Sequence, residues 1–213
     1  MELVRQKTYR KTFEIACNQL AGRNMEERLS KAGLDFRKEG EAYHFSVPFF
    51  NETIEVVAPA FIFISSRASN INLAMKIVIL HYVLNASGQQ TGGSLIQYED
   101  IPGCRSYLPV FERRVVKPLL KAFGYGRDVF IEAGKALGGK EEEYGNASFT
   151  LRALPRVPIT FILWEGDQDF PPSLKVLFDQ SVHTYLPLED ITVVSKMAAT
   201  RIIKQARKEY IEQ

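Results

Sequence analysis

An apolar run, Val157–Trp164, leads directly into a group of carboxylates and then into two adjacent prolines. The preceding residues, 147–153, alternate apolar with polar side chains, and Pro155 separates the two segments. An unbroken apolar run of this length is typical of a strand that is buried on both faces. The sequence therefore predicts that Val157–Trp164 is the central, buried strand of a C-terminal hairpin.

Apolar residues recur every three or four positions in several other segments, a pattern that predicts helices. These segments are residues 4–20, 25–31, 70–84, 106–123, 128–137 and 188–210. Residues 42–47 and 53–57 alternate instead and predict a second hairpin, in which Pro48 indicates an edge strand. A short strand is predicted over 95–98. Helices mixed with hairpins predict an α+β fold, with a largely antiparallel sheet, a central C-terminal hairpin and several flanking helices.

Length and charge limit the classes of protein to which this chain can belong. Its 213 residues, 46% of them hydrophobic, suit a single domain over residues 1–213. A net charge of +2 is too nearly balanced for a general nucleic-acid-binding protein. The N-terminus lacks the apolar segment of a secretory signal, and no apolar run approaches the ~20 residues of a membrane span. We therefore expect a cytoplasmic protein with neither a nucleic-acid nor a membrane partner.

Two cysteines, Cys17 and Cys104, lie far apart in the sequence. We expect free thiols, which are usual in a reducing compartment, and two distant thiols cannot supply the ligands of an iron–sulfur cluster. Cys17 lies among apolar helical neighbours and is predicted to be in the core. Cys104 follows a Pro–Gly turn, where it is either a turn residue or a reactive thiol.

Carboxylates form the leading candidate site of the sequence. They are Glu165, Asp167, Asp169, Asp179, Glu189 and Asp190. Such groups perform acid–base catalysis or bind a hard cation, or they accept hydrogen bonds in turns and at helix N-termini. We expect Asp167, Asp169, Asp179 and Glu189 to converge around Trp164 and His183. Trp164 itself is expected in the core, with ligand stacking as the alternative.

Histidines and basic residues provide the other candidates. The spacing of His44, His81 and His183 fits no metal site, so no metal is predicted, and His81 is expected to pack or to hydrogen-bond locally. Arg113, Lys117 and Lys121 recur at four-residue steps beside Arg114 and form either a solvated face or an anion site. With Trp164, the candidates for cofactor binding are Arg113, Arg114 and Lys117. Residues 88–94, rich in glycine, could present backbone amides to an anion or form an ordinary loop.

Several of these elements, taken in order, resemble an uncharacterised prokaryotic family, domain of unknown function 3786. They are residues 79–88 and 98–103, Phe111 to Arg114, Pro118-Leu119, Phe123-Gly124 and Phe178-Asp179. Relatives in this family are linked with corrinoid or one-carbon metabolism in anaerobes, and some carry a cysteine-rich iron–sulfur segment that this chain lacks. The resemblance implies no established activity.

The resemblance implies a cytoplasmic accessory protein of anaerobic metabolism, corrinoid- or iron–sulfur-linked, that binds a cofactor or metabolite of unidentified structure. One alternative is a metal-assisted or acid–base enzyme that uses the carboxylates around Trp164. Another is a domain that binds a partner protein. The sequence leaves the ligand and the oligomeric state open.

Overall fold

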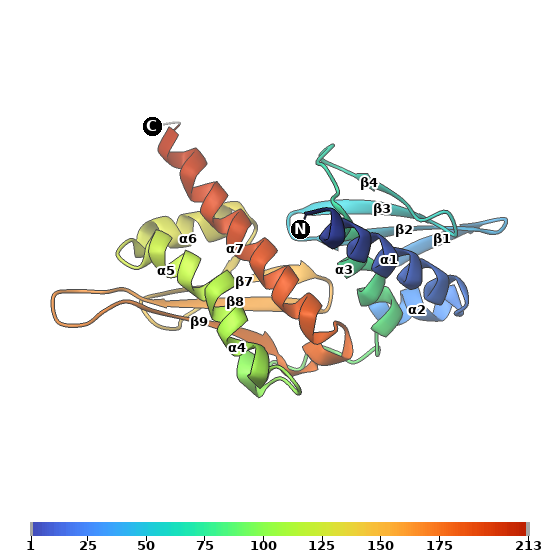
Figure 1. Ribbon diagram of the computed structural model, residues 1–213. Coiled ribbons are helices and arrows are strands. Elements are labelled where there is room, and N and C mark those ends of the chain that lie inside the picture. Colours follow the sequence, from blue (N-terminus) through green and yellow to red (C-terminus); the bar gives the residue numbers. More distant parts are fainter. Residues whose placement is uncertain (1, 212–213) are drawn as a thin grey trace.

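Two antiparallel sheets lie side by side, each with its own helices, in a computed structural model (Figure 1). The structure describes the backbone of residues 2–211 and the side chains of residues 6–208. The first sheet has the strand order β1-β2-β3-β4, and the second has the order β5-β9-β8-β7-β6. The predicted α+β class is confirmed, but the two predicted hairpins belong to two sheets rather than to one.

The first sheet is a meander of four neighbouring strands. They are β1 (Asp35–Glu39), β2 (Ala42–Phe49), β3 (Glu52–Ala58) and β4 (Ile62–Ser65). The β2–β3 hairpin is confirmed, but the edge position inferred from Pro48 is wrong because β2 lies between β1 and β3. Pairing with β1 ends at Ser46, so Pro48 lies beyond the last residue of β2 that β1 contacts. The missing N–H of the proline therefore costs no ladder hydrogen bond there.

Three helices accompany this sheet: α1 (Glu2–Ala21), α2 (Met25–Ala32) and α3 (Leu73–Asn85). All three were predicted, and α2 ends at Gly33, whose positive φ of 68° is the left-handed conformation that glycine favours. The N-cap of α3 is Asn72, whose side chain accepts a hydrogen bond from the Met75 amide at 3.1 Å. The helix predicted over 70–84 therefore begins three residues later than its apolar pattern does.

The second sheet contains the predicted C-terminal hairpin. Its strands are β5 (Leu95–Gln97), β6 (Lys140–Glu141), β7 (Ala147–Leu154), β8 (Val157–Trp164) and β9 (Ser173–Asp179). The strand β8 lies at the centre of the sheet, paired with β7 on one side and β9 on the other, and from Val157 to Leu163 it is almost wholly buried. The central, buried hairpin strand is therefore confirmed, whereas β9 was not predicted.

Helices with an irregular central stretch accompany the second sheet. They are α4 (Leu108–Phe111), a π-helical segment (Glu112–Val116), α5 (Lys117–Phe123), α6 (Arg127–Ala136) and α7 (Leu188–Ile211). The sequence predicted one continuous helix over 106–123, begun by Ser106. Instead, a π-helical segment ends at Val116, two residues before Pro118. In an ordinary α-helical turn the proline ring would contact the carbonyl four residues before it, and the wider π-helical turn relieves this contact. Short 3₁₀ segments cover Tyr98–Asp100, Arg105–Tyr107 and Gln180–Thr184.

One contiguous apolar core includes residues from both sheets and from α7. The two sheets are also joined through backbone, because the Phe50 amide after β2 donates to the Ala153 carbonyl of β7 at 3.0 Å. This shared core supports the expected single domain, which stays a prediction. Within residues 2–211, no helix combines the length and apolar character needed to cross a membrane.

Both thiols are free and belong to apolar surroundings. Cys17 is partly buried against the core, and burial raises its pKa to about 11. Cys104 is fully buried, and burial likewise raises the pKa of its thiol. Because the thiolate is the nucleophile, both shifts oppose reactivity. Cys104 is therefore best interpreted as a buried turn residue.

Candidate functional site

The predicted acidic cluster is divided between the two ends of the β8–β9 hairpin. Trp164 pairs with Ser173 at one end, and Asp179 ends β9 at the other. Six residue steps of strand separate Ser173 from Asp179, a distance of roughly 20 Å. The expected convergence around Trp164 is therefore wrong, because the segment that was to keep Asp179 close is an extended strand. Trp164 is 37% exposed, so its expected place in the core is also wrong.

Asp167, with Asp169, belongs to the turn that joins β8 to β9. The Asp167 carboxylate accepts hydrogen bonds from the backbone amides of Asp169 at 2.8 Å and Phe170 at 2.7 Å. Glu165 accepts a hydrogen bond from the Arg127 amide at 3.0 Å. These contacts match the turn chemistry that was the alternative to a site.

Asp179 is buried and accepts a hydrogen bond from the glycine-rich loop, residues 88–94. Its Oδ2 accepts from the Gly93 amide at 3.0 Å, and its Oδ1 accepts from the Ser181 amide at 2.9 Å and hydroxyl at 2.6 Å. Burial alone would raise the pKa of Asp179, but the hydrogen bonds from Ser181, Gly93 and Gly92 together lower it. The amides of Gly92 and Gly93 in this loop are thus bound to a carboxylate of the protein itself. This loop is ordered by Asp179 rather than open to an external anion.

His183 is exposed and donates from Nδ1 to the Gln180 carbonyl at 2.9 Å, a local contact within the 3₁₀ segment. Glu189 and Asp190 lie in the first turn of α7, and both line a cavity. Among residues whose side chains are described, no three His, Cys, Asp or Glu side chains are grouped so as to hold a metal ion. Of the sequence-predicted carboxylates, only Glu189 and Asp190 contribute to a cavity described below.

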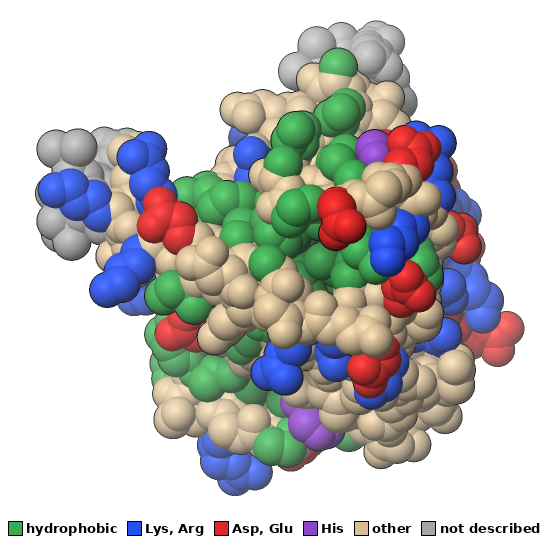
Figure 2. Space-filling model, turned by 90° about the vertical axis from the view of Figure 1, so that its right-hand side faces the viewer, with side chains coloured by type: hydrophobic (Ala, Val, Ile, Leu, Met, Phe, Trp, Pro, Cys, Tyr) green, Lys and Arg blue, Asp and Glu red, His purple; other side chains and the backbone are tan. Residues whose placement is uncertain are grey.

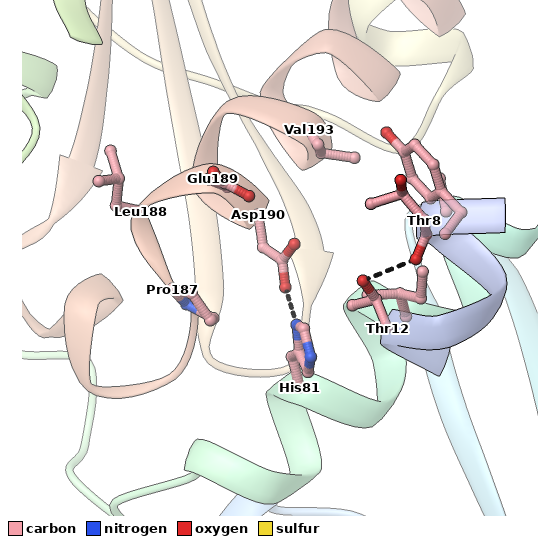
Figure 3. A pocket seen from close by; sticks show the side chains of 11 residues that line it. Thr8, Thr12, His81, Pro187, Leu188, Glu189, Asp190 and Val193 are labelled. Atoms are coloured by element: carbon pink, nitrogen blue, oxygen red, sulfur yellow. Dashed lines mark hydrogen bonds and ion pairs between the residues drawn. The ribbon is translucent and has the colours of Figure 1, made fainter. Parts of the chain in front are cut away.

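The first cavity, here called the His81 cavity, has a volume of about 400 Å³ and lies where α7 begins, facing α1 and α3. Within it, His81 of α3 and Asp190 of α7 meet, with 2.6 Å between Nδ1 and Oδ2 (Figure 3). The side chains are only 19% and 10% exposed. The expectation that His81 bonds locally is wrong, because its partner lies 109 residues away. Other lining residues are Thr12, Ile77, Pro187 and Val193.

A second cavity, here called the basic cavity, has a volume of about 600 Å³ and continues along α7. Tyr9, Ala74 and Val193 line both cavities, so the two adjoin and form one groove. The cationic residues of the basic cavity are Arg114, Lys196, Arg201, Lys204 and Lys208, whereas Glu52 is its one acidic lining residue in the described part of the chain. The groove is therefore strongly cationic along α7.

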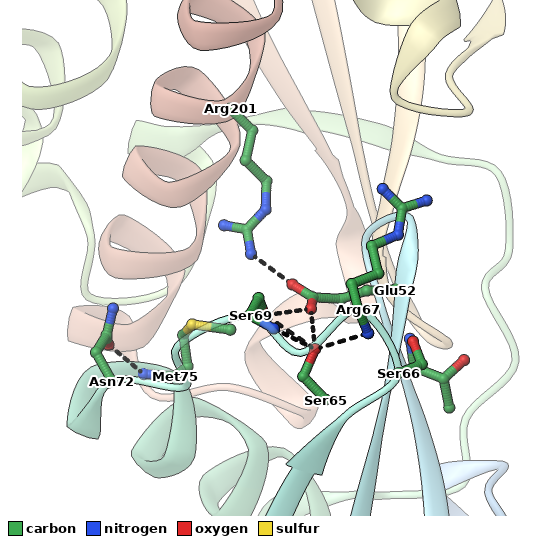
Figure 4. Close-up of polar contacts among 9 residues, drawn as sticks. Glu52, Ser65, Ser66, Arg67, Ser69, Asn72, Met75 and Arg201 are labelled. Atoms are coloured by element: carbon green, nitrogen blue, oxygen red, sulfur yellow. Dashed lines mark hydrogen bonds and ion pairs between the residues drawn. The ribbon is translucent and has the colours of Figure 1, made fainter.

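Glu52 and Arg201 both line the basic cavity and point toward each other (Figure 4). Arg201 Nη2 lies 3.1 Å from Glu52 Oε1, and the Ser65 and Ser69 hydroxyls donate to Oε2 at 2.8 and 2.7 Å. Burial alone would raise the pKa of Glu52, but the hydrogen bonds from Ser69, Ser65 and Arg201 lower it. The Arg201 guanidinium also lies over the Phe50 ring, with Cζ 4.5 Å from the ring centroid. This pair is already satisfied within the protein.

The other four cations of the basic cavity differ from Arg201. Within the described side chains, Arg114, Lys196, Lys204 and Lys208 form no ion pair. Of the predicted basic face, only Arg114 lines the cavity, while Arg113, Lys117 and Lys121 are exposed outside it. Arg114 lies within the π-helical segment, whose widened turn breaks the four-residue spacing on which the predicted face depended.

The family model for the domain of unknown function DUF3786 matches residues 24–201. This chain belongs to that family. No curated protein and no solved structure matches the chain. The resemblance inferred from the sequence elements is thus confirmed as family membership. The matched residues include His81, Asp190, Glu52 and Arg201, so the central part of the groove lies within the DUF3786 region.

Sequence reasoning missed most of the groove in this DUF3786 protein. Lys196, Thr200, Lys204 and Lys208 recur every four residues in a predicted helix, a signal that would have indicated a polar face opposite the apolar stripe. The His81–Asp190 contact has no such signal, since only the packing of α3 against α7 brings the two residues together.

Proposed function

We propose that this protein binds an anionic small molecule, bearing phosphate or carboxylate groups, in the basic cavity along α7. The observation that carries the proposal is the set of four lining cations, Arg114, Lys196, Lys204 and Lys208, that have no ion-pair partner among the described residues. Like charges gathered in one cavity repel one another, and an anion relieves that repulsion. The Glu52–Arg201 pair lines the same cavity and neutralises its own charges, so the other four cations are left to attract the anion.

The size of the cavity favours a small molecule over a macromolecule. A volume of about 600 Å³ lies within the range of small-ligand sites. Figure 2 shows Lys and Arg side chains mixed with Asp and Glu across the face drawn there. With a net charge of only +2, the excess of positive charge is local to the groove. A local cationic groove suits one anionic ligand better than a long polyanion.

Isothermal titration calorimetry with pyrophosphate and with citrate tests the proposal and separates the two anion chemistries. We expect at least one of these probes to bind with a Kd below the millimolar range, and we expect added salt to weaken binding. Lys204→Glu should weaken that binding about tenfold or more, a loss of ~1.4 kcal/mol. The matched control is Lys121→Glu, an exposed lysine outside the groove.

The proposal fails if neither probe binds, or if Lys121→Glu weakens binding as much as Lys204→Glu does. The family resemblance alone supports the finer expectation of a cytoplasmic accessory role in the corrinoid- or iron–sulfur-linked one-carbon metabolism of anaerobes. That role stays a prediction.

A further inference from the structure

The His81–Asp190 pair has the geometry of an oriented base at the edge of the groove. Asp190 Oδ2 lies 2.6 Å from His81 Nδ1. A carboxylate only accepts hydrogen bonds, so Nδ1 carries a proton, and Nε2 is the nitrogen that can accept one. The position of Asp190 in the first turn of α7 also suits its negative charge, because the positive end of the helix dipole lies there.

Nε2 is available to a ligand in the His81 cavity. Among residues with described side chains, none forms a hydrogen bond with His81 Nε2. No buried side-chain nitrogen in the described part of the chain lacks a partner, so the unbonded Nε2 is accessible from the cavity. The Thr12 hydroxyl lines the same cavity but donates to the Thr8 carbonyl at 3.0 Å, as the dashed line in Figure 3 shows. The described lining includes no serine or cysteine that His81 could activate. A molecule bound in the cavity could therefore present a proton to Nε2.

The cations of the basic cavity lie within reach of the same molecule. Six helical residues separate Asp190 from Lys196, a rise of about 9 Å along α7. Val193 lies between them and lines both cavities. A ligand of ordinary metabolite size can therefore place an anionic group at Lys196 and another part beside His81.

We propose that His81 is a general base, positioned by Asp190, that removes a proton from a carbon next to a carbonyl group of an anionic small molecule. The C–H bond breaks, its electron pair forms the carbon–carbon double bond of an enolate, and the carbonyl oxygen takes the negative charge. The proton passes to Nε2, and the imidazolium is neutralised by the Asp190 carboxylate. The proton on Nε2 exchanges with solvent, and a proton then returns from Nε2 to the same carbon, which restores neutral His81 and gives exchange without net change of the molecule.

The choice of a carbonyl compound follows from the charges of the groove. An enolate oxygen gains negative charge during the reaction, and the positive field of the adjoining basic cavity favours that charge. The inference rests on the proposed anion binding, which brings the substrate to His81.

Proton NMR in D₂O gives a direct test, with pyruvate, 2-oxoglutarate, oxaloacetate and dihydroxyacetone phosphate as probes. We expect the wild-type protein to exchange the protons next to the carbonyl group of at least one probe for deuterium. His81→Gln should slow this exchange about 100-fold or more, as expected for loss of a general base. His183→Gln, an exposed histidine outside the groove, is the matched control and should leave the rate unchanged.

If Asp190 positions His81, replacing Asp190 should lower the exchange rate without unfolding the protein. Asp190→Asn should lower the maximal exchange rate with little change in KM, and Asp190→Glu should restore part of the rate. In nitrogen NMR of the wild type, Nε2 of His81 should be the unprotonated nitrogen, and Asp190→Asn should shift the ring towards the other tautomer. Diethyl pyrocarbonate, followed by peptide mass spectrometry, should modify His81 more slowly in the variant.

The inference is overturned if the wild type exchanges none of the four probes, or if His81→Gln exchanges as fast as the wild type. Binding of pyrophosphate or citrate with no exchange of any probe sinks the catalytic role alone. If the wild type binds neither pyrophosphate nor citrate, the proposed function itself is wrong.

Discussion

Arg201 of α7 and Glu52 of β3 form an ion pair of 3.1 Å that joins the helix of the second sheet to the first sheet. Glu52 is 6% exposed and also accepts hydrogen bonds from two serine hydroxyls. Every oxygen of this buried carboxylate therefore has a partner. Such a group is costly to remove, because the partly buried Arg201 guanidinium is left without its counter-ion.

Replacement of Glu52 tests the strength of this connection. Glu52→Ala should lower the free energy of unfolding by about 2–4 kcal/mol, since Arg201 loses its counter-ion and both serines lose an acceptor. The control is Glu55→Ala on the same strand, where the carboxylate is exposed and the change should stay within about 0.5 kcal/mol. Urea denaturation of both variants gives the comparison. Equal losses of unfolding free energy in the two variants would show that the Glu52–Arg201 ion pair stabilises the fold no more than an exposed carboxylate does.

Asp179 should make stability depend on acid pH. Its folded-state pKa lies below the ordinary value of 3.8, so the unfolded chain binds the proton more readily. The carboxylate therefore stabilises the fold above the unfolded pKa, and that contribution is lost as the pH falls through the lower, folded pKa. Asp179→Asn should be less stable than the wild type above about pH 5, and the difference should shrink as the pH falls below about 4.

Chemical denaturation at a series of pH values measures this difference. Asp128→Asn is the control, because the Asp128 side chain is 93% exposed. A constant difference between wild type and Asp179→Asn from neutral to acid pH would contradict the role given to Asp179.

Thr160 lies in the middle of β8, is 2% exposed and shares a hydrogen bond of 2.8 Å with Thr150 of β7. Thr160→Asp should lower the free energy of unfolding by about 3–5 kcal/mol, because it buries a charge that has no partner. Thr160→Val keeps the shape and should cost only about 1 kcal/mol, the usual value of one hydrogen bond. Thermal unfolding of the two variants separates charge from shape. A well-folded Thr160→Asp protein would contradict the burial of β8.

Gly134 of α6 allows the helix to approach β7 closely. A Cβ atom at this position would lie 2.6 Å from Phe149 Cδ1. Alanine gains about 1 kcal/mol of helix propensity over glycine, but the steric overlap costs about 1–3 kcal/mol, so Gly134→Ala should be destabilising overall. At Gly22 the nearest atoms are 3.7 Å away, and Gly22→Ala should be close to neutral. Melting temperatures that rank the two variants in the opposite order would contradict this packing.

The elements that the sequence predicted correctly are those with a strong local pattern. The apolar stripe of α7 has the period of a helix. The run of β8 is eight residues long and follows a proline turn, so its length and flanking residues favour a buried strand. The β9 strand also alternates, with Leu174, Val176 and Phe178 buried, but it follows a carboxylate-rich turn that was interpreted as a site. The β1 strand is exposed throughout and has no apolar pattern to detect.

The candidate site depended on long-range packing and was mostly not predictable. The acidic cluster was assigned from closeness in sequence, whereas an extended strand places Asp167 and Asp179 at opposite ends of a hairpin. His81 and Asp190 meet only because α3 and α7 pack together. Of the predicted site residues, Glu189, Asp190 and Arg114 line the groove, and their neighbours in the sequence do not explain why.

The groove has walls from both halves of the chain, with Tyr9 and Met75 on one side and Lys196 and Lys204 on the other. A molecule bound there would contact residues from both halves of the chain and hold the two sheets together. Its binding energy would be added to the cohesion of the halves, since a ligand that binds only the folded state raises stability in proportion to the logarithm of its concentration. The concentration of ligand in the cell would then affect the stability of the folded protein as well as its activity.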